Sequence, residues 1–275
     1  MYWPDCGSTT VWRRELWEEV VERIHKNVPV LNLAAGSCYP MERQPERFEN
    51  KEDLAYVKWL HGICKVTSVR DALALKLLEA ADCKSQLIPC SAFVFANQMD
   101  ATPEVNGPII INYMAGGGHY DWNQKIDAAQ WEKTIKDLID RLQVRHRVVM
   151  LCHDKQEAQL AKNIAPSCER LLPNTYKEYI SMVANAKVAL CNRMHASVAL
   201  AGMGIPSVAV CTDSRLLMVK QLGLPCFYVK DTSVDTIEAE IALLIRNRLA
   251  IASRLKSLQD STFQGYRRLI QQYVS

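Results

Sequence analysis

Apolar residues follow two different patterns along this chain. Short runs that are almost continuously apolar alternate with longer segments in which apolar residues recur every three or four positions. Continuous apolar runs are typical of strands buried on both faces of a parallel sheet, whereas the longer period is that of an amphipathic helix. The alternation of the two patterns predicts an α/β fold in which helices pack on parallel sheets.

The pattern places each element at a defined range. The strands are expected at Val28–Ala35, Ile63–Val69, Gln86–Pro89, Pro108–Tyr113, Arg147–Cys152, Lys187–Leu190, Ser207–Val210 and Cys226–Val229. The helices are expected at Thr10–His25, Lys51–His61, Asp71–Ala81, Ala128–Gln143, Asp154–Asn163, Lys177–Asn185, His195–Met203, Ser214–Leu222, Val234–Arg246 and Ala250–Tyr273.

A polar segment with a proline, Asn97–Asn106, separates two apolar stretches and indicates a domain boundary. We therefore expect an N-terminal α/β lobe over residues 1–101 and a larger C-terminal α/β lobe over residues 102–249. A C-terminal helix is expected over residues 250–275.

Composition excludes several classes of protein. The chain has 275 residues, of which 49% are apolar and 23% charged, a balance typical of globular proteins. Its 33 basic and 30 acidic residues leave a net charge of only +3, so no nucleic-acid partner is expected. No uninterrupted apolar stretch reaches ~18 residues, which argues against a membrane span. Met1–Asp5 lacks the pattern of a secretory signal, and we expect a cytoplasmic protein.

The ten cysteines are scattered, and no two of them form a C-x-x-C pair. Structural zinc sites and redox motifs commonly use such pairs. Several cysteines lie within apolar runs, where a free thiol packs as a small apolar side chain. We therefore expect no bound metal, and free thiols in a reducing compartment.

The segment from Lys187 to Val210 carries the most informative chemistry. A buried strand runs into a turn at Asn192 and Arg193, and a helix with His195 in its first turn follows. Ligands of open α/β sheets bind at the carboxyl ends of strands, and a helix N-terminus there favours an anion. Arg193 offers a planar fork for a carboxylate or phosphate, and His195 exchanges protons near neutral pH. The alternative interpretation is a surface cation beside a capping residue.

Arg70 and Asp71 occupy a similar position after another apolar strand. Asp71 suits the cap of the helix that follows, and Arg70 lies at the carboxyl end of the strand. The alternative is a local ion pair of little energetic value. Asp213 and Arg215 also follow a strand end, where Asp213 is expected to cap a helix that begins near Ser214.

Three glycines that follow the strand Pro108–Tyr113, with Gly117 at their centre, could let the backbone approach a phosphate. Neither their spacing nor that of Gly202 and Gly204 is the dinucleotide fingerprint in its strand-to-helix context, so no nicotinamide or flavin cofactor is expected. His119 beside the glycines is either a ligand contact or an exposed loop histidine.

Taken together, these segments resemble the polysaccharide pyruvyl transferase family. Those that carry the resemblance are Ser68-Val69-Arg70-Asp71, Asn192-Arg193-Met194-His195-Ala196, Gly204-Ile205-Pro206 and Asp213-Ser214-Arg215, in this order. It extends from about Val28 to Val229 and is strongest around Arg193–Pro206. The resemblance implies two Rossmann-like lobes in a GT-B-like arrangement, with the acceptor on the side of a short N-terminal lobe. The donor anion site would lie in the second lobe, and the last helix would cross back to the first.

The family transfers the enolpyruvyl carbons of phosphoenolpyruvate onto sugar hydroxyls as a ketal. By resemblance, Arg70 and Arg193 would bind the carboxylate and phosphate of this donor, with Asn192 beside them, and His195 would be the general acid. Further candidate ligand contacts are Gly117, His119, Asp213 and Arg215. The scheme requires no cofactor and no metal, and the acceptor would be a carbohydrate or another hydroxyl compound.

The chain departs from the family pattern at three places. Met194 replaces a leucine, and Cys90 stands where the family commonly has an aspartate. The family's opening strand and glycine-rich loop have no clear counterpart before Trp12, which predicts an altered acceptor site. Other functions that fit the same pattern are a GT-B glycosyltransferase, a sugar-nucleotide epimerase and a catalytically silent binding module. The uneven lobes also raise the prospect of a homo-oligomer that completes the site.

Overall fold

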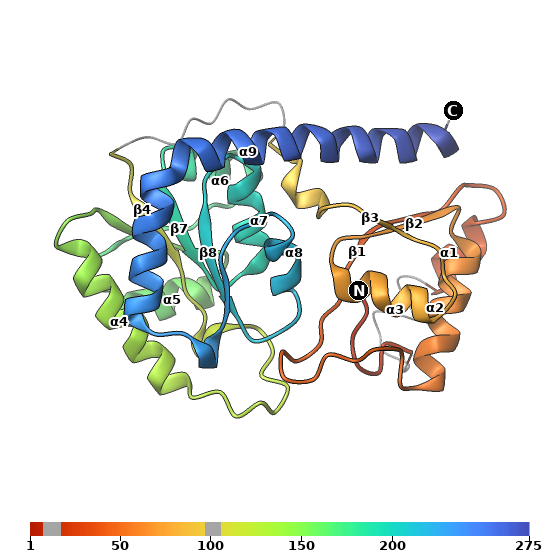
Figure 1. The fold of residues 1–275 in the computed structure, drawn as a ribbon, viewed down its shortest axis with the longest axis horizontal. Coiled ribbons are helices and arrows are strands. Elements are labelled where there is room, and N and C mark those ends of the chain that lie inside the picture. Colours follow the sequence, from red (N-terminus) through yellow and green to blue (C-terminus); the bar gives the residue numbers. More distant parts are fainter. Residues whose placement is uncertain (8–17, 97–105, 275) are drawn as a thin grey trace.

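The computed structural model describes residues 1–7, 18–96 and 106–274. Two parallel sheets form two lobes that lie side by side (Figure 1). The smaller sheet, in the first lobe, has the order β1-β2-β3, and the larger has the order β6-β5-β4-β7-β8-β9. The predicted α/β class with parallel sheets and a short N-terminal lobe is confirmed.

The first lobe is built on a three-stranded sheet. Its strands are β1 (Leu31–Ala35), β2 (Val66–Val69) and β3 (Gln86–Leu87), and its helices are α1 (Glu19–Ile24), α2 (Lys51–Ile63) and α3 (Ala72–Ala80). Asp71 caps α3 as predicted, because its carboxylate accepts a 2.8 Å hydrogen bond from the Ala74 amide. The helix predicted from Thr10 lies partly outside the described residues.

The second lobe contains a six-stranded sheet. Its strands are β4 (Ile109–Asn112), β5 (Val148–Leu151), β6 (Glu169–Leu171), β7 (Val188–Cys191), β8 (Ser207–Cys211) and β9 (Cys226–Tyr228). Its helices are α4 (Ala128–Gln143), α5 (Lys155–Ile164), α6 (Tyr176–Val183), α7 (Met194–Gly202) and α8 (Leu216–Lys220), with short 3₁₀ turns η2 (Ser91–Phe93), η3 (Ala115–Gly117) and η4 (Val229–Asp231).

Helices cover both faces of the larger sheet, which explains why its central strands are apolar at nearly every position. Ile109 and Ile111 pack against α4 and α9, whereas Ile110 between them packs against α6 and α7 on the opposite face. Every residue of β4, β5, β7 and β8 is buried. β6 was not predicted, because it is an edge strand whose Glu169 and Arg170 are exposed.

One helix, α9 (Val234–Val274), joins the two lobes. It was predicted as two helices, but residues 247–249 contain no glycine or proline to end it, and it continues for 41 residues. Figure 1 shows that α9 bends as it leaves the second lobe and then runs across to the first. There the Tyr266 hydroxyl donates a 2.7 Å hydrogen bond to the Pro89 carbonyl, and Leu269 packs in a cluster with Ala34.

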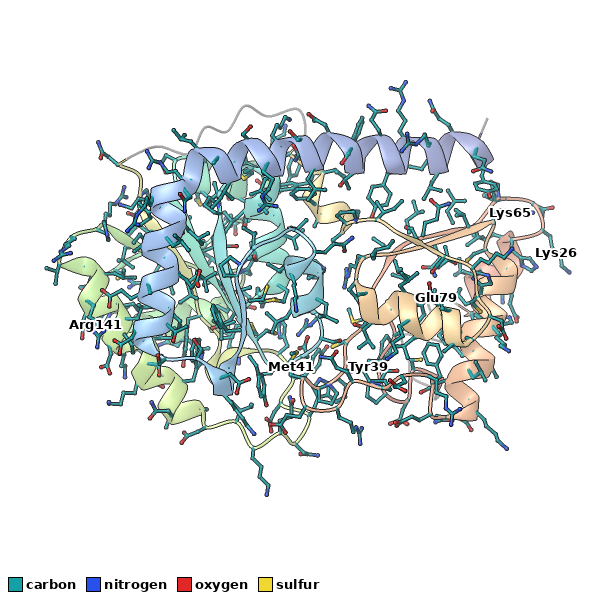
Figure 2. The ribbon with its side chains drawn as sticks, viewed as in Figure 1. Lys26, Tyr39, Met41, Lys65, Glu79 and Arg141 are labelled. Atoms are coloured by element: carbon teal, nitrogen blue, oxygen red, sulfur yellow. The ribbon has the colours of Figure 1, made fainter. Side chains whose placement is uncertain are left out.

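A second connection between the lobes is the segment after β1. Ser37 Oγ lies 2.7 Å from Ser214 Oγ of the second lobe, and the Tyr39 amide donates to the same Ser214 oxygen at 2.9 Å. The Met41 amide donates to the Thr212 carbonyl at 3.2 Å. Figure 2 places Tyr39 and Met41 between the two lobes. These hydrogen bonds fix the position of the segment after β1 against the second lobe.

The predicted boundary at Asn97–Asn106 lies almost wholly outside the described residues. The division into residues 1–101, 102–249 and 250–275 therefore stays a prediction. Of the helices in the described ranges, none is long and apolar enough to cross a membrane.

Candidate functional site

The carboxyl ends of strands from both lobes carry the predicted site residues. Arg70 follows β2 in the first lobe, Arg193 follows β7, and Arg215 lies beyond β8. The structure brings these three arginines and His119 close to His195. Together with desolvation, their charges lower the pKa of His195. Carboxyl ends of parallel strands meet at one edge of a sheet, which is where ligands of open α/β sheets bind.

Arg70 is the cation in this cluster that has no carboxylate partner in the described part of the chain. The residue is only 8% exposed, and its Nη1 contacts His195 Nε2 at 2.9 Å and Cys90 Sγ at 3.7 Å. Its buried Nε has no hydrogen-bond partner among the described residues. A Cβ on Gly36 would lie 2.3 Å from that nitrogen, so only glycine lets the guanidinium pack here.

His195 is neutral in this environment. A guanidinium only donates hydrogen bonds, so His195 Nε2 accepts from Arg70 and the ring proton belongs on Nδ1. Desolvation by the atoms that crowd the partly exposed ring, together with the charges of Arg70 and Arg215, lowers the pKa of His195 to about 4. The ring therefore has no positive charge near neutral pH in the protein alone.

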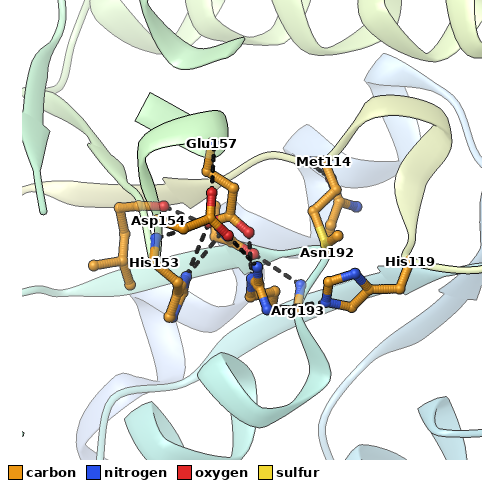
Figure 3. A network of polar contacts seen from close by, with 9 residues as sticks. Met114, His119, His153, Asp154, Glu157, Asn192 and Arg193 are labelled. Atoms are coloured by element: carbon orange, nitrogen blue, oxygen red, sulfur yellow. Dashed lines mark hydrogen bonds and ion pairs between the residues drawn. The ribbon is translucent and has the colours of Figure 1, made fainter. Parts of the chain in front are cut away.

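Arg193 is held by two carboxylates at the start of α5 (Figure 3). Its Nε donates to Glu157, and its Nη2 donates to Asp154 at 2.8 Å. Its Nη1 contacts His119 Nε2 at 2.9 Å, and its amide donates to Asn112 Oδ1 at 2.8 Å. The pKa of His119 is lowered by burial and by the charge of Arg193. The two carboxylates thus fix the position of Arg193 and largely compensate its positive charge.

Glu157 is the centre of this network and was missed in the sequence. Its carboxylate also accepts hydrogen bonds from the His153 amide at 2.9 Å and from Asn112 Nδ2 at 3.1 Å. Burial alone would raise the pKa of Glu157, but hydrogen bonds from His153 and Arg193 hold it below its ordinary value. The signal available was a capping pattern after an apolar strand, with Asp154 accepting a hydrogen bond from the Glu157 amide.

Asn192 uses both polar groups of its side chain within the protein. Its Oδ1 accepts from the Met114 amide at 3.0 Å, and its Nδ2 donates to the Val210 carbonyl at 2.9 Å. Asn192, which follows β7, therefore connects the loop after β4 with strand β8. Its contact with a donor stays a prediction.

Asp213 and Arg215 form a buried ion pair with two hydrogen bonds, of 2.8 Å from Nε and 2.6 Å from Nη2. Asp213 was expected to cap a helix from Ser214, which is wrong, because α8 begins at Leu216 and the carboxylate binds the Arg215 amide and guanidinium instead. Burial opposes the charged form of Arg215, but the hydrogen bonds to Asp213 raise its pKa. The guanidinium lies 5.1 Å from the centre of the Tyr120 ring.

Gly117 lies apart from the hydrogen-bonded cluster. It is buried with a φ of +80°, and a Cβ there would lie 2.7 Å from Val229 Cγ2. A Cβ on Gly118 would lie 2.4 Å from Thr212 Oγ1. These glycines let the loop approach the ends of β8 and β9 closely, and they bring His119 to Arg193. A ligand contact at Gly117 stays a prediction.

Two further features define the chemistry available. A pocket of about 430 Å³ opens beside His195 and Arg193, with walls from α6 and α7. Within the described ranges, no group of three or more His, Cys, Asp or Glu residues is placed to hold a metal ion. All ten cysteines are free.

Solved structures of UDP-N-acetylglucosamine 2-epimerases are similar in fold. A putative UDP-N-acetylglucosamine 2-epimerase from Listeria monocytogenes has a TM-score of 0.54 and 10% identity, over 87% of this chain and 72% of its own. The UDP-GlcNAc 2-epimerase from Neisseria meningitidis bound to UDP-GlcNAc has a TM-score of 0.53 and 11% identity, over 91% and 72%. The predicted GT-B-like arrangement of two Rossmann-like lobes is confirmed. At such identities the likeness concerns the fold alone.

No curated protein matches this chain in sequence. The family model for polysaccharide pyruvyl transferase matches residues 6–214, which is more than half of the chain and includes Arg70, Arg193 and His195. This chain therefore belongs to the polysaccharide pyruvyl transferase family.

Proposed function

We propose that this protein transfers the enolpyruvyl carbons of phosphoenolpyruvate onto two hydroxyls of a carbohydrate or similar acceptor, forming a ketal. The observation that carries the proposal is the position of Arg70, which is buried, faces His195 and lacks a carboxylate partner in the described part of the chain. A buried, uncompensated guanidinium favours a small anion with carboxylate or phosphate oxygens.

Charge balance distinguishes Arg70 from the other two arginines. Arg193 is paired with Glu157 and Asp154, and Arg215 is paired with Asp213. Arg70 is therefore the principal donor ligand in this proposal, and Arg193 and Arg215 contribute mainly to the local field. This assignment differs from the equal pair of Arg70 and Arg193 that the family resemblance implied.

The N-terminus of α7 supplies a second feature that suits an anion. Its N-cap residue, Arg193, gives the first turn no side-chain hydrogen bond. The Ala196 amide already donates to the Arg193 carbonyl, but amides at the very start of a helix have no partner within it and point along its positive dipole end. An anion on Arg70 could therefore also accept hydrogen bonds from the start of α7, which carries His195.

The proposed reaction balances without an oxidant or reductant. One acceptor hydroxyl oxygen attacks C2 of phosphoenolpyruvate while the methylene carbon gains a proton and becomes a methyl group. The second hydroxyl oxygen then attacks C2, the bond from C2 to the phosphate oxygen breaks, and inorganic phosphate leaves. Of the two hydroxyl protons, one ends on the methyl group and one on the phosphate.

His195 is the proton donor to the methylene carbon in this proposal. Near neutral pH the ring is uncharged in the protein alone, since its pKa is about 4. A bound trianion would offset the charges of Arg70 and Arg215 and raise the pKa of His195. His195 would therefore be protonated, and able to act as the general acid, only when the donor is bound.

Calorimetric titration of phosphoenolpyruvate into wild type and Arg70→Met tests the proposal. Arg70→Met keeps most of the side-chain volume and removes the guanidinium. We therefore expect the affinity for phosphoenolpyruvate to fall at least about tenfold. The matched control is Arg145→Met, at an exposed arginine outside the site, which should bind like wild type. Equal binding by wild type and Arg70→Met would show that the donor site is elsewhere.

The likeness to an epimerase bound to UDP-GlcNAc favours a second candidate, an enzyme that acts on sugar nucleotides. That function predicts stabilisation by UDP and none by phosphoenolpyruvate. A catalytically silent binding module predicts instead that donor binding occurs but no acceptor is ever modified.

A further inference from the structure

The pocket beside His195 extends beyond the cluster of Arg70, Arg193 and Arg215. His195 and Arg193 line it, whereas Arg70 and Arg215 do not. His195 and Ala199 are one helical turn apart on α7, so the pocket continues directly from the imidazole along the helix surface. His195 is therefore shared between the contact with Arg70 and this region of about 430 Å³.

Three aromatic side chains, Phe95, Tyr176 and Tyr179, line the pocket. Tyr176 and Phe95 are 64% and 39% exposed, which is high for side chains of their size. The Phe95 and Tyr179 rings meet edge to face with centroids 6.4 Å apart, and Tyr179 also contacts His153 at 6.0 Å. These contacts position the Tyr179 ring, while the exposed surface of Tyr176 and Phe95 is accessible to a ligand.

Small residues line another part of the pocket and leave its volume open. Ala196 and Ala199 of α7 line the pocket, together with Ala92 of η2. The lining is mainly apolar, which suits a group that has one apolar face.

The pocket offers no free charge for a phosphate group. Arg193 is the one permanently charged residue among the described lining residues, and two carboxylates already pair with it. A nucleoside diphosphate would leave its phosphates without a cation here, whereas a neutral polyhydroxyl group would not. Asn174 and His153 add polar atoms that can meet hydroxyl groups at the rim.

We propose that this pocket is the acceptor subsite and that it holds a neutral pyranose ring, with the C–H face of the sugar against Tyr176 and Phe95. A vicinal or 1,3-related pair of its hydroxyls then points toward His195, on whose other side the anionic donor is bound. The acceptor role rests on the proposed function, while the sugar-binding chemistry rests on the pocket itself.

The test is saturation-transfer NMR with a panel of methyl hexosides on wild type and on four variants. Ala199→Phe fills the pocket, Tyr176→Ala removes the stacking ring, and Tyr176→Phe retains it. Ala250→Phe adds the same bulk at an exposed position of α9 and serves as control. At least one hexoside should bind wild type, Tyr176→Phe and Ala250→Phe. Its affinity for Ala199→Phe and Tyr176→Ala should fall at least about fivefold.

Phosphoenolpyruvate titration of the same variants separates this inference from the proposed function. Retained donor affinity in Ala199→Phe and Tyr176→Ala, with hexoside binding lost, is the expected result and also shows that both variants fold. Hexoside binding without donor binding in wild type would refute pyruvyl transfer but keep the sugar pocket. The inference is overturned if no hexoside binds wild type, if both pocket variants bind hexosides normally, or if UDP occupies the pocket in their place.

Discussion

Arg70 Nη1 and His195 Nε2 lie 2.9 Å apart, although the residues belong to different lobes and are separated by 125 positions in the sequence. The contact places an uncompensated guanidinium against the proposed proton donor. It depends on how the two lobes are held together, and it adds to the desolvation that lowers the pKa of His195.

The interlobe hydrogen bonds of Ser214 should stabilise this arrangement. Ser214→Ala leaves the buried Tyr39 amide without its acceptor and Ser37 Oγ without one partner. We expect a loss of about 1–3 kcal/mol in the free energy of unfolding, measured with urea. Ser257→Ala, at an exposed serine of α9, is the control. Identical unfolding of the two variants would mean that the Ser214 contacts contribute nothing to stability.

Glu157→Gln should destabilise the protein most strongly near neutral pH. Because hydrogen bonds and Arg193 lower the pKa of Glu157, its stabilising effect is present above its unfolded value of about 4.5. That effect is lost as pH falls through the lower folded value. The loss at neutral pH should be about 1–3 kcal/mol and should shrink under acid conditions.

The control for this variant is Glu132→Gln, in a half-exposed pair with Lys136 on α4. Unfolding curves at several pH values should show only a small change for it, below about 0.5 kcal/mol. A pH-independent effect of Glu157→Gln would indicate lost packing rather than a lost carboxylate.

His195→Gln should make the ligand-free protein less sensitive to acid. The folded pKa of about 4 lies below the unfolded value of 6.5, so the unfolded chain binds the proton more tightly. Stability of the wild type therefore falls between these two values as pH decreases, and the variant lacks this contribution. Thermal melts of both proteins across this range measure it, and parallel curves would contradict the lowered pKa.

Gly117→Ala tests whether this glycine serves packing or ligand binding. The new Cβ would meet Val229 in a backbone conformation with positive φ, so we expect a loss of about 1–3 kcal/mol. Gly62→Ala, where nothing lies within 4 Å of the new Cβ in α2, should stabilise by roughly 0.5–1 kcal/mol. If Gly117 serves packing alone, donor affinity should change in neither variant. A selective loss of phosphoenolpyruvate binding in Gly117→Ala would make the loop part of the donor site.

Local sequence patterns were sufficient for most of the fold. The continuous apolar runs marked β4, β5, β7 and β8 because each is buried on both faces, and Asp71 marked the start of α3. β6 was not predicted because an exposed edge strand has no apolar run. The continuity of α9 was not predicted because the polar run Arg246-Asn247-Arg248 interrupts its apolar pattern.

The candidate site was predictable only residue by residue. Arg70, Arg193 and His195 were identified from strand ends and family motifs, but their partners depend on tertiary structure. No local pattern shows that Asp154 and Glu157 form ion pairs with Arg193. Nor does any local pattern show that Arg70 of the first lobe contacts His195 of the second. The different carboxylate partners of the two arginines follow from these long-range contacts.

The most direct measurement of the central claim is the proton uptake that accompanies phosphoenolpyruvate binding. Calorimetry in two buffers of different ionisation enthalpy at about pH 8, where the free ligand is fully ionised, isolates protons taken up by the protein. We predict uptake by wild type, its loss in His195→Gln with binding retained, and weak binding by Arg70→Met. Wild-type affinity in Arg70→Met, or unchanged uptake in His195→Gln, would contradict the assignment of these two residues to a donor site.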